Sequence, residues 1–149
     1  MTNTSKTAGA TKGPAVISKT LLGSASALQQ LSVALQAISA EVPARTSARQ
    51  CMAFLTVAYL DTMGKSITMS DLRELVGEDN EGQPILGNSV ERTLNSFLEP
   101  TKRDPEALGW LTHENDADDR RRKYLRLTLE GQEAATRFIE AYQGRALKE

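Results

Sequence analysis

The chain has 149 residues, with 19 acidic side chains, 18 basic side chains and one histidine, and its formal net charge is −1. This length fits one domain with a real core, or one domain with an added dimerisation segment. The charge balance excludes binding to nucleic acid through overall positive charge, and the single cysteine, Cys51, excludes an intramolecular disulfide and a multi-cysteine metal site. One cysteine is consistent with a reducing cytoplasm, and we expect neither a metal ion nor another cofactor.

Residues 1–14 carry almost no large apolar side chain, so we expect a flexible tail, because such a segment cannot offset the cost of ordering. Residues 15–42 predict a helix from about Ser18 to Ala40, which stops before Pro43 because the residue preceding a proline is disfavoured in a helix. Its apolar positions follow steps of four and three and form one seam: Ile17, Leu21, Leu28, Leu31, Leu35, Ile38 and Val42.

Alanine, serine and glutamine flank this seam instead of charged residues, which indicates that more of the helix than the seam is covered by protein. Gly23 and the serines and glutamines make the segment too polar to span a membrane. One copy could cover the seam within its own domain, but a symmetric dimer would do so more naturally. We therefore expect residues 15–42 to be a dimerisation helix.

Beyond Pro43, Thr46 or Ser47 can cap a second helix. Residues 52–60 of this helix are apolar on nearly all sides, which is typical of the central helix of a domain. Cys51 lies within it, and Arg49 is the one cation nearby in sequence. We interpret Cys51 as a core cysteine rather than a peroxide-sensing thiol, because a reactive thiol needs access and a lowered pKa.

Residues 64–66 predict a turn, and Ile67 can form a minimal strand. The run Thr68–Asp71 has the form of a capping box for a third helix, which Gly77 ends. Three apolar residues of this helix are expected to face inward: Leu72, Leu75 and Val76. Residues 78–87 contain two glycines and a proline and predict a loop.

A fourth helix is expected from Ser89 to about Glu99, with Asn88 as its cap. Its buried stripe consists of Val90, Leu94, Phe97 and Leu98. Its outward face is polar without an acidic side chain: Ser89, Arg92, Thr93, Asn95 and Ser96. Such residues suit a DNA major groove, where arginine pairs with guanine and asparagine with adenine, although any solvated amphipathic helix can carry them.

Residues 109–129 predict a β-hairpin with a basic tip. Residues 109–114 are rich in strand formers, residues 115–118 are polar turn formers, and four cations follow from Arg120 to Lys123. Leu125, Leu127 and Leu129 then alternate with polar or aromatic neighbours, so the leucines should face a core while Arg126 faces out.

Five residues of this segment form a recognisable pattern: Asp119, Arg121, Leu127, Thr128 and Gly131. The segment resembles the wing of the MarR family of winged-helix transcription regulators, which carries Asp-x-Arg, then Leu-Thr, then a glycine that opens the C-terminal helix. The resemblance implies that Asp119 orients Arg121 by an ion pair while Arg121 enters the DNA minor groove. It covers residues 43–131 in order of elements, and the chain departs from the family at residues 78–87 and 100–108, where it is longer.

The last segment, residues 132–149, belongs to a helix expected from Glu130 to Leu147 with a broad apolar face. It is too short to supply the two C-terminal helices of many MarR-like dimers. Pairing of the first helix with this helix of a second copy would bury both faces. The expected dimer interface comprises Leu21, Leu28, Leu31, Leu35, Ile38, Phe138 and Tyr142.

The fold expected from these features is mainly α with a small β-hairpin wing (α+β), a winged helix-turn-helix with N- and C-terminal dimerisation helices. The expected function is that of a cytoplasmic, homodimeric, sequence-specific regulator that binds double-stranded DNA and acts as a repressor. The fourth helix would lie in the major groove and the wing at the minor groove. The wing residues expected at the DNA are Asp119, Arg120, Arg121, Arg122 and Lys123.

An enzyme is not expected, because the single histidine, His113, has no cysteine nearby and the sequence has no phosphate loop or nucleophile motif. A small-molecule effector would fit the resembled family, but no residue identifies a ligand. The alternative function is a winged-helix module that contacts a protein instead of DNA. The salt dependence of duplex binding would separate the two functions, because neutralising phosphates makes affinity fall steeply with salt.

Overall fold

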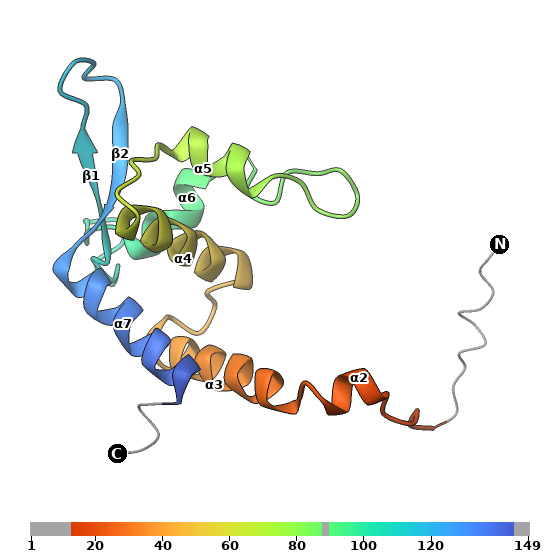
Figure 1. Cartoon of the computed structure of the whole chain (residues 1–149). Coiled ribbons are helices and arrows are strands. Elements are labelled where there is room, and N and C mark those ends of the chain that lie inside the picture. The colour runs from red at the N-terminus through yellow and green to blue at the C-terminus, as the bar shows by residue number, and fades with distance from the viewer. Residues whose placement is uncertain (1–12, 88–89, 145–149) are drawn as a thin grey trace.

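A computed structural model describes residues 13–87 and 90–144 of the chain. The fold is mainly helical with one two-stranded antiparallel sheet, which confirms the expected α+β class. In Figure 1 the hairpin rises at one end of the molecule beside α5, α4 lies at the centre, and α3 and α7 lie together at the opposite side. Most of the expected tail, residues 1–12, lies outside the described residues.

The first predicted helix is two helices, α2 (Lys19–Leu22) and α3 (Ala25–Glu41). Gly23 ends α2, and its backbone N–H donates to carbonyls of that helix, while the Ser24 hydroxyl donates to the Thr20 carbonyl. The prediction of one continuous helix was therefore wrong at residues 23–24. The other end agrees with prediction, because Val42 is extended and precedes Pro43.

The C-terminal half of α3 packs against α7 (Leu129–Gln143) of the same chain. Ile38 of α3 and Phe138 of α7 are both buried in the core, and Arg137 forms an ion pair with Glu41 at 2.6 Å. The pairing of these two helices expected between copies is thus made within one copy. In Figure 1 the N-terminal part of α3 and all of α2 extend away from the body.

Helix α4 (Ala48–Thr62) is the central helix, as predicted. Ser47 caps it in a capping box with Gln50. Its Phe54 ring stacks on Phe97 with the ring centroids 5.3 Å apart and lies 5.1 Å from Trp110. Phe138 packs edge-on against Trp110 with the ring centroids 5.7 Å apart, so this aromatic cluster joins α4, the residues before the hairpin and α7.

Helix α5 (Met69–Val76) begins with the predicted capping box of Thr68 and Asp71 and ends at Gly77. Leu72 is fully buried, but Leu75 is 59% exposed, so the inward placement of Leu75 was wrong. Ile67 is not part of a strand, yet its carbonyl accepts a hydrogen bond of 2.8 Å from the N–H of Leu125. One backbone hydrogen bond to β2 is therefore made at the position where the minimal strand was expected.

The loop at residues 78–87 is fastened at its base. Arg49 of α4 donates to the Ile85 carbonyl at 2.9 Å and lies 3.7 Å from the Asp79 carboxylate. Asp79 also accepts from the N–H groups of Glu81 and Gln83, which shapes the turn. Leu86 is buried in the core, so the last part of this loop contributes to packing.

The fourth helix is shorter than predicted, because α6 (Val90–Leu94) continues only as a 3₁₀ turn, η1 (Asn95–Phe97). The carbonyls of Ser96, Phe97 and Leu98 accept hydrogen bonds from residues 108–110, and Leu98 is extended. The returning chain has thus taken the acceptors that a longer helix would need. Asn88 and Ser89 lie outside the described residues.

The hairpin consists of β1 (Leu111–Asn115) and β2 (Lys123–Leu127), paired with Leu111 opposite Leu127. Leu125 is buried and Leu127 is half-buried, as predicted, whereas Leu129 is exposed because it opens α7 instead of continuing the strand. Thr128 caps α7 and also donates to the Gly109 carbonyl at 2.6 Å. Helix α7 ends at Gln143 with Gly144 in the left-handed region, short of the predicted Leu147, which lies outside the described residues.

Candidate nucleic-acid interface

The tip of the hairpin is organised around Asp116. Its Oδ1 accepts hydrogen bonds from the N–H groups of Asp118 and Asp119, at 2.7 and 3.2 Å. Its Oδ2 accepts from the hydroxyl of Tyr124 at 2.6 Å. The Tyr124 bond is the main cause that lowers the pKa of Asp116, and the same bond raises the pKa of Tyr124.

Asp119 and Arg121 lie beside each other at this tip. The Asp119 carboxylate accepts from the backbone N–H of Arg121 at 3.0 Å and lies 3.5 Å from its Nε. The Arg121 side chain is 92% exposed, so the backbone bond holds the residue while the guanidinium extends into solvent. Arg120, Arg122 and Lys123 are exposed as well. The tip therefore presents four neighbouring cations.

A groove of about 450 Å³ separates the hairpin tip from the start of α5. On one side it is lined by Arg121, Arg122 and Lys123 with His113 of β1, and on the other by residues 68–71. The first turn of a helix also directs unpaired backbone N–H groups outward, which favours negative charge. The groove thus combines basic side chains with a helix start, although Asp71 contributes one carboxylate.

The structure divides the residues predicted on the outward face of the fourth helix. Arg92 and Asn95 are exposed, and Thr93 is half-buried with its carbonyl accepting from Gln50 at 2.9 Å. The Ser96 hydroxyl is buried without a hydrogen-bond partner among the described residues, so the outward placement of Ser96 was wrong. Its carbonyl binds the returning chain at Leu108, which keeps this residue against the body. Ser89 lies outside the described residues.

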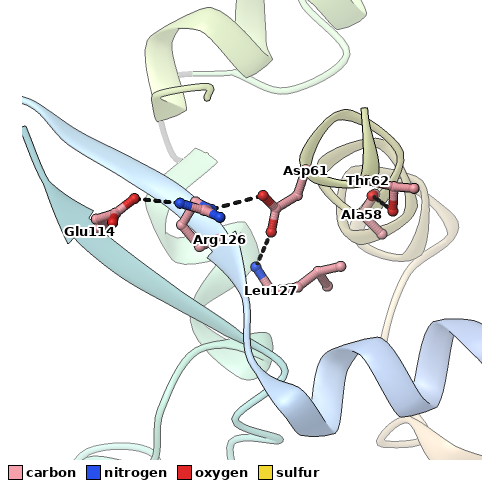
Figure 2. Close-up of polar contacts among 6 residues, drawn as sticks. All are labelled: Ala58, Asp61, Thr62, Glu114, Arg126 and Leu127. Atoms are coloured by element: carbon pink, nitrogen blue, oxygen red, sulfur yellow. Dashed lines mark hydrogen bonds and ion pairs between the residues drawn. The ribbon is translucent and has the colours of Figure 1, made fainter. Parts of the chain in front are cut away.

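The base of the hairpin is fixed by an ion-pair network that the sequence did not reveal. Figure 2 shows Arg126 between Asp61 of α4 and Glu114 of β1, with Nε 2.8 Å from Asp61 and Nη1 2.6 Å from Glu114. The hydrogen bond to Glu114 is the largest single cause that raises the pKa of Arg126, and the hydrogen bond to Asp61 raises it as well. Arg126 is still partly exposed, so its outward orientation is correct, but its role is to join elements. The sole sequence signal for Asp61 is a carboxylate that follows the apolar stretch of residues 52–60.

The residues predicted for a dimer interface separate into two groups. Leu21, Leu28, Leu31 and Leu35 are each between 42% and 58% exposed, and Tyr142 is 41% exposed. Ile38 and Phe138 are buried within their own chain, so assigning them to a contact with a second copy was wrong. Of the predicted interface residues, those that stay uncovered are therefore the four leucines of α2 and α3 and Tyr142 of α7.

Cys51 is half-buried in α4, and burial raises the pKa of its thiol. Within residues 13–87 and 90–144, no three histidine, cysteine, aspartate or glutamate side chains are grouped so that they could hold a metal ion. Over the same residues, no helix has both the length and the apolar character needed to cross a membrane. No family model, curated protein or solved structure matches the chain, and the candidate interface is therefore defined by the residues described above.

Proposed function

We propose that the chain is a sequence-specific regulator of transcription that binds double-stranded DNA as a homodimer and acts as a repressor. The observation that carries this proposal is the basic groove between the hairpin tip and the start of α5. The chain has a net charge of −1, so this concentration of cations is local and offers phosphates one defined docking surface.

The order of elements supports a winged helix-turn-helix. Helices α4, α5 and α6 are followed by the hairpin, and α5 and α6 contact each other. The Ile67 carbonyl binds the outer edge of β2 at Leu125, where a third strand would lie in a winged helix. In this arrangement α6 is the helix for the major groove, with Arg92, Thr93 and Asn95 nearest the bases, and the hairpin is the wing.

The contact between Asp119 and Arg121 supports the role of the wing that the MarR resemblance implies. Arg121 is held through its backbone and remains almost fully exposed, which suits a side chain that reaches into a minor groove. Arg120 and Lys123 would then bind phosphates on either side.

The exposed leucines support the homodimer. Leu21, Leu28, Leu31 and Leu35 lie on a projecting segment whose flanking residues are mostly uncharged. Large exposed apolar patches on a projecting element mark a protein contact. A second copy related by twofold symmetry would cover the same leucines on both chains and would place two wings on one duplex.

An interaction module without specific DNA binding is the second candidate. It is favoured by a groove of about 410 Å³ between the end of α4 and α5, lined by Leu60, Ile67 and the exposed Leu75. This groove carries one lysine and two carboxylates, Asp71 and Glu74, and so has no excess of positive charge. A protein segment would suit it better than a nucleic acid.

A salt titration of duplex binding tests the proposal. Full-length protein is titrated against a random duplex at several salt concentrations, and the slope of log affinity against log salt is compared with that of Arg121→Ala and Lys123→Ala. Each variant should reduce the slope by about one, because each removes one phosphate or groove contact. Lys19→Ala, which removes an exposed cation from α2, is the matched control. Binding that is absent, or independent of salt, would exclude the proposal and favour the interaction module.

A further inference from the structure

We infer that Asp61 is a positioning residue that holds the wing at a fixed angle to α4, so that the basic tip and α6 can reach one duplex together. This inference rests on the proposed function for its DNA readout. Its structural content is independent of that function, because it concerns how the hairpin is fastened to the helical body.

Asp61 uses both carboxylate oxygens on two consecutive residues of β2. Oδ1 accepts from Nε of Arg126 at 2.8 Å, and Oδ2 accepts from the backbone N–H of Leu127 at 2.8 Å (Figure 2). The Asp61 side chain is only 13% exposed, so water competes weakly for these bonds. A carboxylate that binds both a side chain and the backbone of one strand fixes the direction of that strand as well as its distance.

The same contacts complete the outer edge of the hairpin. An edge strand presents unpaired N–H groups. On β2 the N–H of Leu125 donates to the Ile67 carbonyl at 2.8 Å, and the N–H of Leu127 donates to Asp61. At Leu127 the acceptor is the Asp61 side chain, because among the described residues no third strand pairs with β2. Asp61 therefore acts where a third strand would otherwise hold the sheet.

Arg126 also connects Asp61 with β1, the other strand of the hairpin. Its Nη1 binds Glu114 of β1 at 2.6 Å, so one guanidinium connects α4 with both strands. Glu114 and Arg126 belong to the same hairpin and move together, and their contact cannot set the angle between hairpin and helix. Of the two carboxylates that bind Arg126, Asp61 is the one on the helical body.

The length of the hairpin amplifies any change at its base. Five residues of strand extend about 17 Å, so a tilt of roughly 10° at Asp61 would displace the tip by roughly 3 Å. A displacement of this size is comparable to the length of a hydrogen bond. The cations of the tip would then move away from the phosphates while α6 stayed in place on the duplex. The contacts of the wing would therefore be lost first.

Simple electrostatics predicts the opposite result for a mutation. Asp61→Ala removes a negative charge from the domain and should strengthen duplex binding if charge alone matters. If Asp61 positions the wing, Asp61→Ala should weaken specific binding by about tenfold or more and reduce the salt slope. In an Arg121→Ala background the same substitution should have little further effect, because the main groove contact of the wing is already gone.

The experiment compares four variants of the full chain by fluorescence anisotropy at one fixed salt concentration. Thr62→Ala is the matched control, since its hydroxyl donates to the Ala58 carbonyl within α4 (Figure 2), and its affinity should stay within about twofold of wild type. Glu114→Gln leaves the bonds to α4 in place and should not weaken binding. Asp61→Asn keeps an acceptor for Leu127 and should fold, with an affinity below wild type. Equal or tighter binding by folded Asp61→Ala and Asp61→Asn would overturn the inference.

A distance measurement decides the positioning role even if no duplex binds. Spin labels are attached at Ala117→Cys in the tip and Leu55→Cys on α4, in a Cys51→Ser background, and the distance distribution is measured by pulsed electron resonance. Both sites are exposed. A narrow distribution that broadens in Asp61→Asn but not in Thr62→Ala supports the inference. A distribution that Asp61→Asn leaves unchanged refutes it, whereas failure of the wild type to bind DNA would refute only the proposed function.

Discussion

Gly131 and Trp110 approach so closely that a β-carbon on Gly131 would overlap the carbonyl oxygen of Trp110. This contact brings the first turn of α7 against the residue that precedes β1, and Thr128 donates its N–H to the same carbonyl at 3.0 Å. The glycine at this position is therefore required by packing, independently of any role in DNA binding.

Gly131→Ala should lower the free energy of unfolding by about 1–3 kcal/mol, because the added methyl group forces the helix away from the hairpin. Chemical denaturation measures the change. Gly23→Ala is the control, since a β-carbon there meets nothing closer than 3.6 Å, and it should leave the stability nearly unchanged or raise it. Equal effects of the two substitutions would show that the contact with Trp110 is not rigid.

Leu28→Glu combined with Leu35→Glu should convert dimers to monomers and abolish tight DNA binding at the same time. Both side chains are at least half exposed in a single chain, so the monomer should keep its fold and its thermal midpoint. Analytical ultracentrifugation at micromolar concentration measures the association. Gln36→Glu adds a charge to the same helix at an exposed position and should remain dimeric. A wild type that sediments as a monomer would contradict the proposed homodimer.

Arg92→Ala should cost about 1–3 kcal/mol at the specific site and little on random duplexes, because base contacts carry sequence information. Lys123→Ala should instead weaken all duplexes alike and reduce the salt slope by about one. Competition between a selected operator and random DNA measures the difference. An unchanged preference in Arg92→Ala would mean that α6 is not the element that reads the sequence.

If the Asp119 carboxylate orients Arg121 as proposed, Asp119→Ala should weaken duplex binding although it removes a negative charge from the tip. A simple basic patch predicts tighter binding. Four affinities at one salt concentration, for wild type, both single variants and the double variant, separate the two models. Strong coupling is expected, with Asp119→Ala costing little once Arg121 is alanine. Additive effects, or tighter binding by Asp119→Ala, would remove the orienting role and leave a basic patch.

The bond between Asp116 and Tyr124 should make the order of the tip depend on pH at both extremes. The pKa of Asp116 is lowered, so its contribution is present above the ordinary carboxyl pKa of about 4 and is lost as the pH falls through the lowered value. The pKa of Tyr124 is raised, so its contribution is present below about 10 and is lost as the pH rises through the raised value.

Backbone amide shifts of Asp118 and Asp119 should follow these two transitions in NMR spectra. Tyr124→Phe removes the alkaline transition and should bring the acid transition closer to the ordinary carboxyl pKa, because the hydroxyl is the main cause of the shift. Amide shifts that stay constant at low pH would show that Asp116 does not organise the tip.

The sequence predicted those elements whose signals are local. The capping residues Ser47 and Thr68 start helices where a hydroxyl can meet a backbone N–H three residues on, and Gly77 ends one. The alternation of Leu125 and Leu127 likewise predicted β2, because period two is a property of the strand itself. Such features need no knowledge of distant residues.

The predictions were wrong where residues distant in sequence determine the position of a side chain. Ser96 was placed outward by helical periodicity, but the chain at residues 108–110 returns and ends the helix there. Phe138 fits a dimer seam by its spacing, yet Trp110 and the core of its own chain cover it. Asp61 and Arg126 are 65 positions apart, and nothing in either neighbourhood indicates their ion pair. These contacts depend on tertiary structure, which periodicity does not encode.

Arg49 donates to the Ile85 carbonyl and lies beside the Asp79 carboxylate, and this clamp determines where the protein could accept inserted residues. Leu86, just beyond the clamp, fills part of the core, whereas residues 80–83 lie outside it in exposed or turn positions. A reporter peptide inserted between Glu81 and Gly82 would lie outside both the clamp and Leu86, whereas a shorter turn would remove N–H groups that donate to Asp79. An insertion at Leu86 would instead displace a side chain of the core.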